Sequence, residues 1–280
     1  MRWTPGGRSR NLEDRRGSGG GMGMPMGIGG TVVLLVLSLL FGRNLFNDVG
    51  VQPGQTVSTS GGALADSAAE EPQVQFVSFV LDNAQQTWAQ VLPSEANVPW
   101  HDAKLVLFRQ AVQSGCGAAQ SAMGPFYCPA DQKVYVDLGF YDELRSRFGA
   151  PGDFAQAYVL AHEIGHHVQH LMGTDEQVRR AQRASGGAEA NRYSVALELQ
   201  ADCYAGIWAH HTNQQRILEQ GDVEEGLAAA AAVGDDRIQQ QSTGSVNPES
   251  FTHGSSAQRA SWFRRGYESG QMRSCDTFAG

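Results

Sequence analysis

The stretch from Tyr158 to Gly173, YVLAHEIGHHVQHLMG, is the feature that most constrains the fold of this 280-residue chain. Its apolar residues recur at helical spacing, and on a helix two side chains four positions apart lie on one face. His162 and His166 can therefore reach one ion, while Glu163 lies beside that face without being a ligand. This H-E-x-x-H arrangement predicts that two imidazoles hold one Zn²⁺ and that the glutamate takes a proton from the attacking water.

The other two histidines of this stretch fit such an ion less well. His167 points about 100° away from His166 around the helix, and His170 is two turns, about 12 Å, from His162. A metzincin would need a further histidine at position 172, where the chain has Met172. We therefore expect both to be surface or supporting residues, and a third protein ligand to come from elsewhere.

A second long helix, predicted over 189–212, carries the best candidate for that ligand. Glu198 and Asp202 are four apart, so they share a face, and small residues beside them allow close helix packing. Glu198 can complete a His-His-Glu site with one open position, and Asp202 can accept the other ring N–H of a ligating histidine. Gly165 removes a side chain where the two helices must approach. The alternative is a solvated acidic face on an alanine-rich helix.

The segment SFTHGSSAQRASWFRRG contains two candidates for stabilising an oxyanion. His253 precedes a helix predicted over 255–268, and Arg259 follows six residues later. An imidazole or a guanidinium aimed at developing negative charge can supply that stabilisation, so we place both in the catalytic set with Glu163. The alternatives are a histidine in a capping loop and a structural arginine.

The N-terminal region combines positive charge with a long apolar run. Residues 1–16 hold five arginines against Glu13 and Asp14, and residues 22–42 are uncharged. Twenty residues at about 1.5 Å each can cross a hydrocarbon core of about 30 Å. We predict a cytoplasmic Arg/Gly-rich tail over 1–21, an uncleaved signal anchor over 22–42, and a catalytic domain outside the inner membrane. A cleaved signal peptide and a buried core helix are the alternatives, although no A-x-A site directly follows the run.

Composition sets the remaining boundaries. Residues 43–72 are rich in Gly, Ser, Ala, Pro and acidic residues, which predicts a flexible linker before a folded domain over 73–280. The net charge is −8 and no basic stripe follows the N-terminus, so nucleic acid is not expected as a partner. The expected partners are a protein or peptide substrate and the membrane; the oligomeric state is left open.

Four cysteines fit an oxidising location and allow three pairings. We prefer Cys116 with Cys128 and Cys203 with Cys275, because the first closes a short loop and the second ties the C-terminus to a helix. Four unpaired buried thiols are the alternative.

The remaining patterns predict an α+β fold that is mainly helical with a small sheet. Apolar spacing predicts a helix from Val74 that ends at Pro93, and another over 222–233. The segments 104–109 and 133–138 read as short strands, joined by a loop that contains GPFYCP. One of the two strands is expected to form the edge of a cleft that pairs with an extended substrate.

Four separated blocks, AHEIGHHVQ, ELQADCYAG, GPFYCPADQKVYVDL and FTHGSSAQRASWF, resemble the neutral zinc metallopeptidase family over residues 73–280. Members are small bacterial proteins with one N-terminal membrane segment. The motif order is also similar to that of Ste24/HtpX-like membrane gluzincins. This similarity implies that Glu198 binds zinc, that Asp202 supports a histidine, and that His253 and Arg259 act on the substrate or transition state. The proline usual after that histidine is Gly254 here.

The sequence thus predicts a zincin-like, membrane-anchored, extracytoplasmic zinc metallopeptidase. The rival from another class is a non-catalytic zinc-containing envelope protein that binds a peptide or a partner. A zinc hydrolase acting on non-peptide amides is a third alternative.

Overall fold

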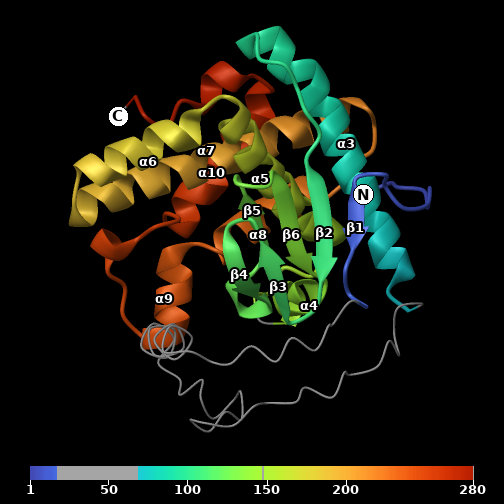
Figure 1. Cartoon of the computed structure of the whole chain (residues 1–280), viewed down its shortest axis with the longest axis horizontal. Coiled ribbons are helices and arrows are strands. Elements are labelled where there is room, and N and C mark those ends of the chain that lie inside the picture. The colour runs from blue at the N-terminus through green and yellow to red at the C-terminus, as the bar shows by residue number, and fades with distance from the viewer. Residues whose placement is uncertain (18–68, 147, 280) are drawn as a thin grey trace, which may run out of the picture.

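The computed structural model describes residues 1–17, 69–146 and 148–279 (Figure 1). Its strands are short: β1 (Leu12–Asp14), β2 (Lys104–Phe108), β3 (Ala111–Ser114), β4 (Gly117–Gln120), β5 (Phe126–Cys128) and β6 (Lys133–Asp137). Its helices are α3 (Glu71–Ala96), α4 (Gly139–Ser146), α5 (Asp153–Leu171), α6 (Thr174–Ala184), α7 (Gly187–Gln214), α8 (Asp222–Ala232), α9 (Asp235–Thr243) and α10 (Ser256–Ser269). Three 3₁₀ turns complete the described elements: η1 (Ser121–Met123), η2 (Pro248–Ser250) and η3 (Met272–Cys275). This is the mainly helical α+β architecture that the sequence predicts.

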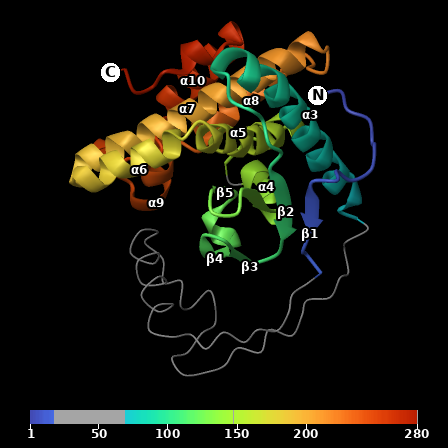
Figure 2. The same cartoon turned by 45° about the horizontal axis from the view of Figure 1, so that its top comes forward.

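Helix α5, which carries the H-E-x-x-H motif, is the centre of the fold. It lies between the sheet and the helices α7, α8 and α10, and α3 packs along it (Figure 1, Figure 2). Leu160, Ile164 and Val168 are fully buried because neighbours cover the helix on several sides. Apolar burial of this extent holds the motif on a rigid element.

The main sheet has the order β1-β2-β6-β5. Strands β1, β2 and β6 are parallel, and β5 runs antiparallel to β6. Leu105, Val106 and Leu107 are each 0% exposed, as expected for a strand covered on both faces. The two predicted strands are present as β2 and β6. The segment expected to be a loop between them contains the hairpin β3–β4 and the strand β5.

Residues 1–17 are packed on this domain, which differs from the predicted separate tail. Strand β1 pairs with β2, and the ring of Trp3 lies 5.3 Å from that of Phe76 on α3. Arg16 is almost buried and forms ion pairs with Asp14 and Glu70. The predicted boundary at residue 73 therefore misses this segment. Its arginines face acidic side chains, and arginine content alone does not distinguish such a segment from one that flanks a membrane.

The predicted anchor over 22–42 and nearly all of the linker over 43–72 fall outside the described residues. Within the described ranges, none of the helices combines the length and the hydropathy needed to span a bilayer. A single crossing by residues 22–42 would place residues 1–17 and the domain on opposite sides of a membrane. The pairing of β1 with β2 requires them on the same side, so the two arrangements cannot exist in one molecule at the same time.

Both disulfides have the pairing that we preferred. Cys116–Cys128 connects the turn of the β3–β4 hairpin to β5, and Cys203–Cys275 connects α7 to η3 near the C-terminus. The first stabilises the sheet beside α5, and the second closes a long loop, where cross-links remove the most chain entropy.

Several helix boundaries differ from the prediction. Helix α3 continues through Pro93 for one more turn and ends where Asn97 adopts a left-handed conformation, φ 54°. A proline near the end of a helix loses only one backbone hydrogen bond, so it does not have to stop the helix. The helices α4, α6 and α9 were not predicted, because each is short and mostly polar.

The crossing of α5 and α7 depends on a glycine, as the sequence predicted. A Cβ on Gly165 would lie 3.0 Å from the carbonyl oxygen of Ala201 and 3.1 Å from its Cα. The backbones of the two helices are therefore nearly in contact at the level of the motif. This brings residues of α7 within reach of the histidines on α5.

Gly165→Val is expected to destabilise the protein by about 1–3 kcal/mol, because the added methyl groups overpack this crossing. The free energy of unfolding from urea denaturation checks the value. Gly186→Val is the matched control, since a Cβ there meets no atom within 4 Å and the backbone is extended. Equal stability of both variants and the wild type would show that the crossing tolerates the extra volume.

Candidate metal centre

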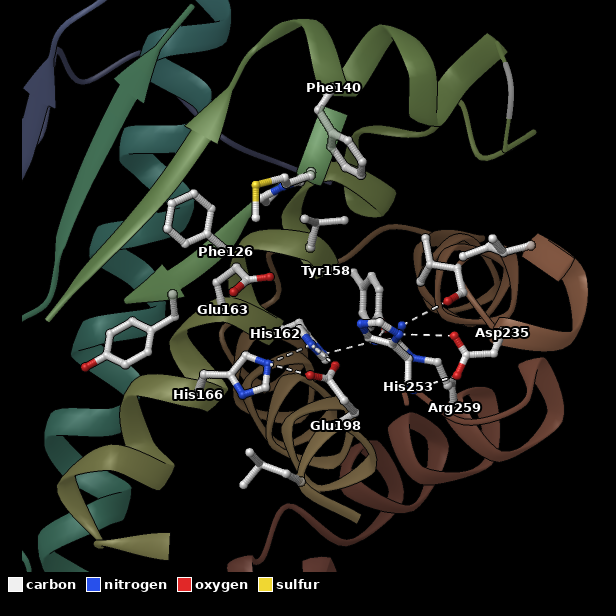
Figure 3. A pocket seen from close by; sticks show the side chains of 18 of the residues that line it. Phe126, Phe140, Tyr158, His162, Glu163, His166, Glu198, Asp235, His253 and Arg259 are labelled. Atoms are coloured by element: carbon white, nitrogen blue, oxygen red, sulfur yellow. Dashed lines mark hydrogen bonds and ion pairs between the residues drawn. The ribbon is translucent and has the colours of Figure 1, made fainter. Parts of the chain in front are cut away.

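Helices α5 and α7 bring three metal-binding atoms together (Figure 3). Nε2 of His162 lies 3.2 Å from Nε2 of His166 and 3.1 Å from Oε2 of Glu198. Nε2 of His166 lies 3.5 Å from Oε1 of Glu198. The structure thus juxtaposes the three residues that the sequence predicted as ligands.

The spacing of these three residues fits a zinc ion. Zinc binds nitrogen and oxygen at about 2.0–2.2 Å, so neighbouring ligands of a tetrahedral ion lie about 3.3 Å apart. Nδ1 of each imidazole has an acceptor on its outer side, Asp202 for His162 and Gln169 for His166. Both Nε2 atoms and the Glu198 carboxylate therefore point toward one another. Because all three are electron-pair donors, a proton or a cation must lie between them.

Charge in this space favours a cation. Burial opposes protonation of His162, but the Asp202 and Glu198 carboxylates outweigh it and raise the pKa of His162 to about 10. Burial likewise raises the pKa of Glu198, but His166 and His162 outweigh it and hold that pKa well below its usual range. A divalent ion can take the place of the proton and bind all three groups.

Asp202 lies behind His162 and is completely buried. Its Oδ1 is 2.8 Å from Nδ1 of His162, which fits the predicted support of a ligating histidine. Arg259 on α10 donates to both oxygens of Asp202, at 2.8 and 2.9 Å, and the hydroxyl of Tyr158 also donates to Asp202.

The placement of Arg259 differs from its predicted role at the oxyanion. Arg259 is 4% exposed, and Asp202, the Val233 carbonyl and the Tyr158 hydroxyl accept its hydrogen bonds. Arg259 lines the cavity, but its shortest contacts are with Asp202, and its Nη2 lies 3.4 Å from Nδ1 of the metal ligand His162. The spacing in the sequence could not show this, because the contact joins residues 57 positions apart.

Gln169 supports the second histidine and was not predicted. It is fully buried, its Oε1 lies 2.9 Å from Nδ1 of His166, and its amide nitrogen donates to the Leu197 carbonyl and to Gln200. The position three residues after His166 on the same helix is a signal that could have identified it.

Glu163 is 7% exposed and lines the cavity beside the three ligands. Figure 3 shows its carboxylate next to the imidazole pair. No other described residue forms a hydrogen bond with this carboxylate. Burial raises the pKa of Glu163, and the nearby histidines offset this only in part. A buried carboxylate with a raised pKa, beside the ligands but not among them, is suited to act as a general base.

His253 lies on the opposite wall, in a loop held by Asp235. Nδ1 of His253 is 3.1 Å from Oδ1 of Asp235, and Oδ2 accepts the backbone N–H groups of Thr252, His253 and Gly254. Burial lowers the pKa of His253, but Asp235 and Glu198 outweigh it and raise that pKa. Asp235 was not predicted, and no motif in the sequence marks it.

Gly254 explains why this loop lacks the usual proline. Its φ is 92°, a left-handed conformation that is open to glycine, whereas proline is restricted to about −65°. The loop after His253 therefore has a backbone shape that the proline-containing pattern cannot adopt.

The two other histidines of the motif have structural partners. His167 faces away from the site as expected, but it is 0% exposed and is not a surface residue. Nε2 of His167 lies 2.7 Å from the His101 carbonyl, and its Nδ1 accepts from the Tyr127 hydroxyl at 2.9 Å, which ties α5 to β5. His170 pairs with Asp175 at 3.0 Å.

Acid is expected to destabilise the protein through His167. Burial lowers the pKa of His167 from 6.5 to about 4, so the unfolded chain binds a proton at a higher pH than the folded protein does. The contribution of His167 to the free energy of unfolding is then fully present above about pH 6.5, and it falls by about 3 kcal/mol as the pH drops to about 4. Urea denaturation between pH 7 and 4, with chelator throughout, measures this slope. His167→Gln, which can keep both hydrogen bonds, should remove that part of the slope; an unchanged slope would contradict the assignment.

A cavity of about 630 Å³ adjoins the three ligands, a size typical of ligand sites.

A second group of carboxylates in the described ranges, which includes Asp153 and Asp222, is less suited to hold a metal ion. The Met1 ammonium already lies 2.9 and 3.3 Å from these two carboxylates and neutralises them. Asp153 is the first residue of α5, and Gly152 occupies the N-cap position. In the described ranges, His162, His166 and Glu198 are the group best suited to hold an ion.

A motif helix with two histidines and a glutamate, a third ligand from a second helix and an adjoining cavity define a zincin-like metal centre. Comparison with known proteins agrees: the family model "Putative neutral zinc metallopeptidase" matches residues 1–278. The chain belongs to this family, and the family implies a zinc ion. The match includes the N-terminal strand β1, so the shared pattern is longer than the predicted domain.

Two similar proteins come from different bacteria. The chain is 49% identical over 285 residues to "Uncharacterized protein YpfJ" of Escherichia coli strain K12, which covers 99% of each chain. It is 50% identical over 184 residues to "Uncharacterized protein Rv2575" of Mycobacterium tuberculosis strain H37Rv, which covers 62% of this chain and 61% of the relative. The search of solved structures found no significant match.

Proposed function

We propose that this protein is a zinc peptidase in which His162, His166 and Glu198 hold the ion. The observation that carries the proposal is Glu163: a buried carboxylate in the cavity beside three converging ligands, to which none of the described residues donates a hydrogen bond. A structural zinc site has no use for such a carboxylate and is closed by four protein ligands. Only three converge among the described residues, so the observations favour a peptidase over the non-catalytic rival.

Each residue has a role that its contacts support. A bound zinc ion supplies a Lewis acid that polarises a carbonyl and makes a nearby water more acidic. Glu163 accepts the proton of the attacking water. Asp202 and Gln169 fix the ring orientation of His162 and His166. The ring of His253, oriented by Asp235, lines the cavity and can direct Nε2 at the oxyanion of a substrate carbonyl.

The strand β5 is the best candidate for the cleft edge. The sequence favoured one of the strands 104–109 and 133–138, but β2 and β6 each have a strand on both sides. Strand β5 pairs with β6 on one side, is the last strand of the described sheet, and contributes Phe126 and Tyr127 to the cavity wall. An extended peptide can add to such an edge through main-chain hydrogen bonds.

Metal removal tests the proposal. Purified protein is expected to carry about one zinc ion per chain and to cleave an unfolded protein such as reduced casein. A chelator should abolish cleavage, and one equivalent of Zn²⁺ should restore it, because three ligands without the ion leave no Lewis acid. Bound zinc without cleavage of any unfolded protein or peptide would instead support the non-catalytic rival.

An extracytoplasmic domain remains part of the proposal, as does a membrane attachment that leaves residues 1–17 on the same side of the membrane as the domain, because β1 pairs with β2. Two disulfides support an oxidising compartment. A reporter enzyme that is active only outside the cytoplasm, fused after the C-terminus, tests the location. An inactive but intact fusion would place the domain inside the cell.

A further inference from the structure

Six apolar side chains line the cavity, and we call them the apolar compartment: Met123, Phe126, Phe140, Phe148, Val159 and Ile238. These side chains come from separate segments: the turn η1, strand β5, helix α4 and the residues after it, helix α5, and helix α9. None carries a charge. Chain segments far apart in sequence therefore build one apolar wall, as a ligand-binding compartment requires.

The compartment begins next to the reacting groups. Val159 lies one turn before Glu163 on α5, and residues four apart share a helix face. Figure 3 shows Phe126 and Phe140 on the side of the imidazole pair where Glu163 lies. A side chain that enters the compartment therefore belongs to a residue close to the scissile bond.

The walls of the compartment are held in place. The ring of Phe126 stacks on Tyr135 at 4.9 Å and 6°, and the Tyr135 hydroxyl donates to Asp131 at 2.6 Å. Phe140 packs against Phe148, with ring centroids 6.4 Å apart. Met123, in contrast, is 61% exposed at the mouth of the cavity. An apolar surface that is fixed yet open to solvent is typical of a binding site.

The lining of the cavity also contains a charged pair. Arg179 and Asp175 form an ion pair at 3.0 Å, and His170 also contacts Asp175. Because the six apolar side chains and this pair differ in chemistry, the cavity can distinguish an apolar side chain of a peptide from a charged one.

We infer that the enzyme selects peptides with a large apolar side chain, aromatic or Leu-like, at a residue flanking the scissile bond, and that the apolar compartment receives this side chain. The inference rests on the proposed peptidase function. Burial of such a side chain is favourable, whereas an acidic side chain would lose its hydration without gaining a partner.

Quenched fluorescent peptides that differ at one position beside the cleavage site test this inference. The zinc-loaded full chain is expected to cleave peptides with Phe or Leu about 10- to 100-fold faster, in kcat/KM, than those with Ala, and to cleave those with Asp most slowly. Mass spectrometry of the products identifies on which side of the scissile bond the side chain lies. Equal rates for Phe and Asp would overturn the inference and leave the proposed function intact, whereas no cleavage of any peptide would overturn both.

Two substitutions assign the preference to these residues. Phe140→Ala should lower the Phe-over-Ala ratio about 10-fold, while Phe278→Ala, on an exposed residue near the C-terminus, should leave it unchanged. Ile238→Glu should increase cleavage at Lys and Arg relative to Phe, a gain that misfolding cannot produce. An Ile238→Glu enzyme that is active with the wild-type preference would place the selected side chain elsewhere.

Discussion

Glu163→Gln is expected to lower kcat by about 10²- to 10⁴-fold while the protein keeps its zinc ion. Gln has nearly the same size as Glu but cannot accept a proton at neutral pH. It also changes none of the three metal-binding groups, whose mutual distances are 3.1–3.5 Å. Stability should not fall, because burial already raises the pKa of Glu163 and so disfavours its charged form.

Two measurements on the same preparation check this prediction. Elemental analysis gives the zinc content, and the cleavage rate at saturating substrate gives kcat. Glu189→Gln, which makes the same change on an exposed residue of α7, is the control and should behave as the wild type does. Full activity in Glu163→Gln would mean that another group is the base, and loss of zinc would mean that Glu163 is a ligand.

Much of the metal centre could be predicted because it obeys local rules. Residues four apart on a helix lie on one face, which holds for His162 and His166 on α5 and for Glu198 and Asp202 on α7. Gly165 and Ala201 indicated a close crossing, and the structure has it. Helices of 19 and 28 residues carry enough apolar periodicity to be recognised from the sequence.

The parts that could not be predicted depend on long-range pairing. Strands β1 and β5 have three residues each, too few for a periodic pattern, and they form only because β2 and β6 offer partners. Asp235 belongs to a short polar helix, and its importance comes from backbone groups of residues 252–254. The arginine-rich composition of residues 1–16 is the same whether these arginines flank a membrane segment or form ion pairs on the domain, so composition could not distinguish the two.

Arg259→Met is expected to destabilise the protein by about 3–5 kcal/mol, because it leaves the carboxylate of Asp202 buried without its strongest partner. Asp202 is 0% exposed and Arg259 is 4% exposed, so water cannot replace the lost contact. Zinc affinity should also fall, by about 10- to 100-fold, since Asp202 orients His162. Arg264→Met, an exposed arginine on the same helix, is the control and should change neither quantity.

The double variant Arg259→Met with Asp202→Asn separates support of the ligand from action on the substrate. Once Asp202 is neutral, loss of the guanidinium leaves no buried charge, so the double variant should be more stable than the sum of the two single effects predicts. Urea denaturation of the four proteins, each saturated with zinc, gives the coupling energy. If Arg259 acted directly on the oxyanion, as its spacing in the sequence suggested, Arg259→Met would lower kcat without changing unfolding or zinc affinity. The bidentate contact at 2.8 and 2.9 Å instead favours an effect on stability and zinc affinity, transmitted through Asp202 to His162.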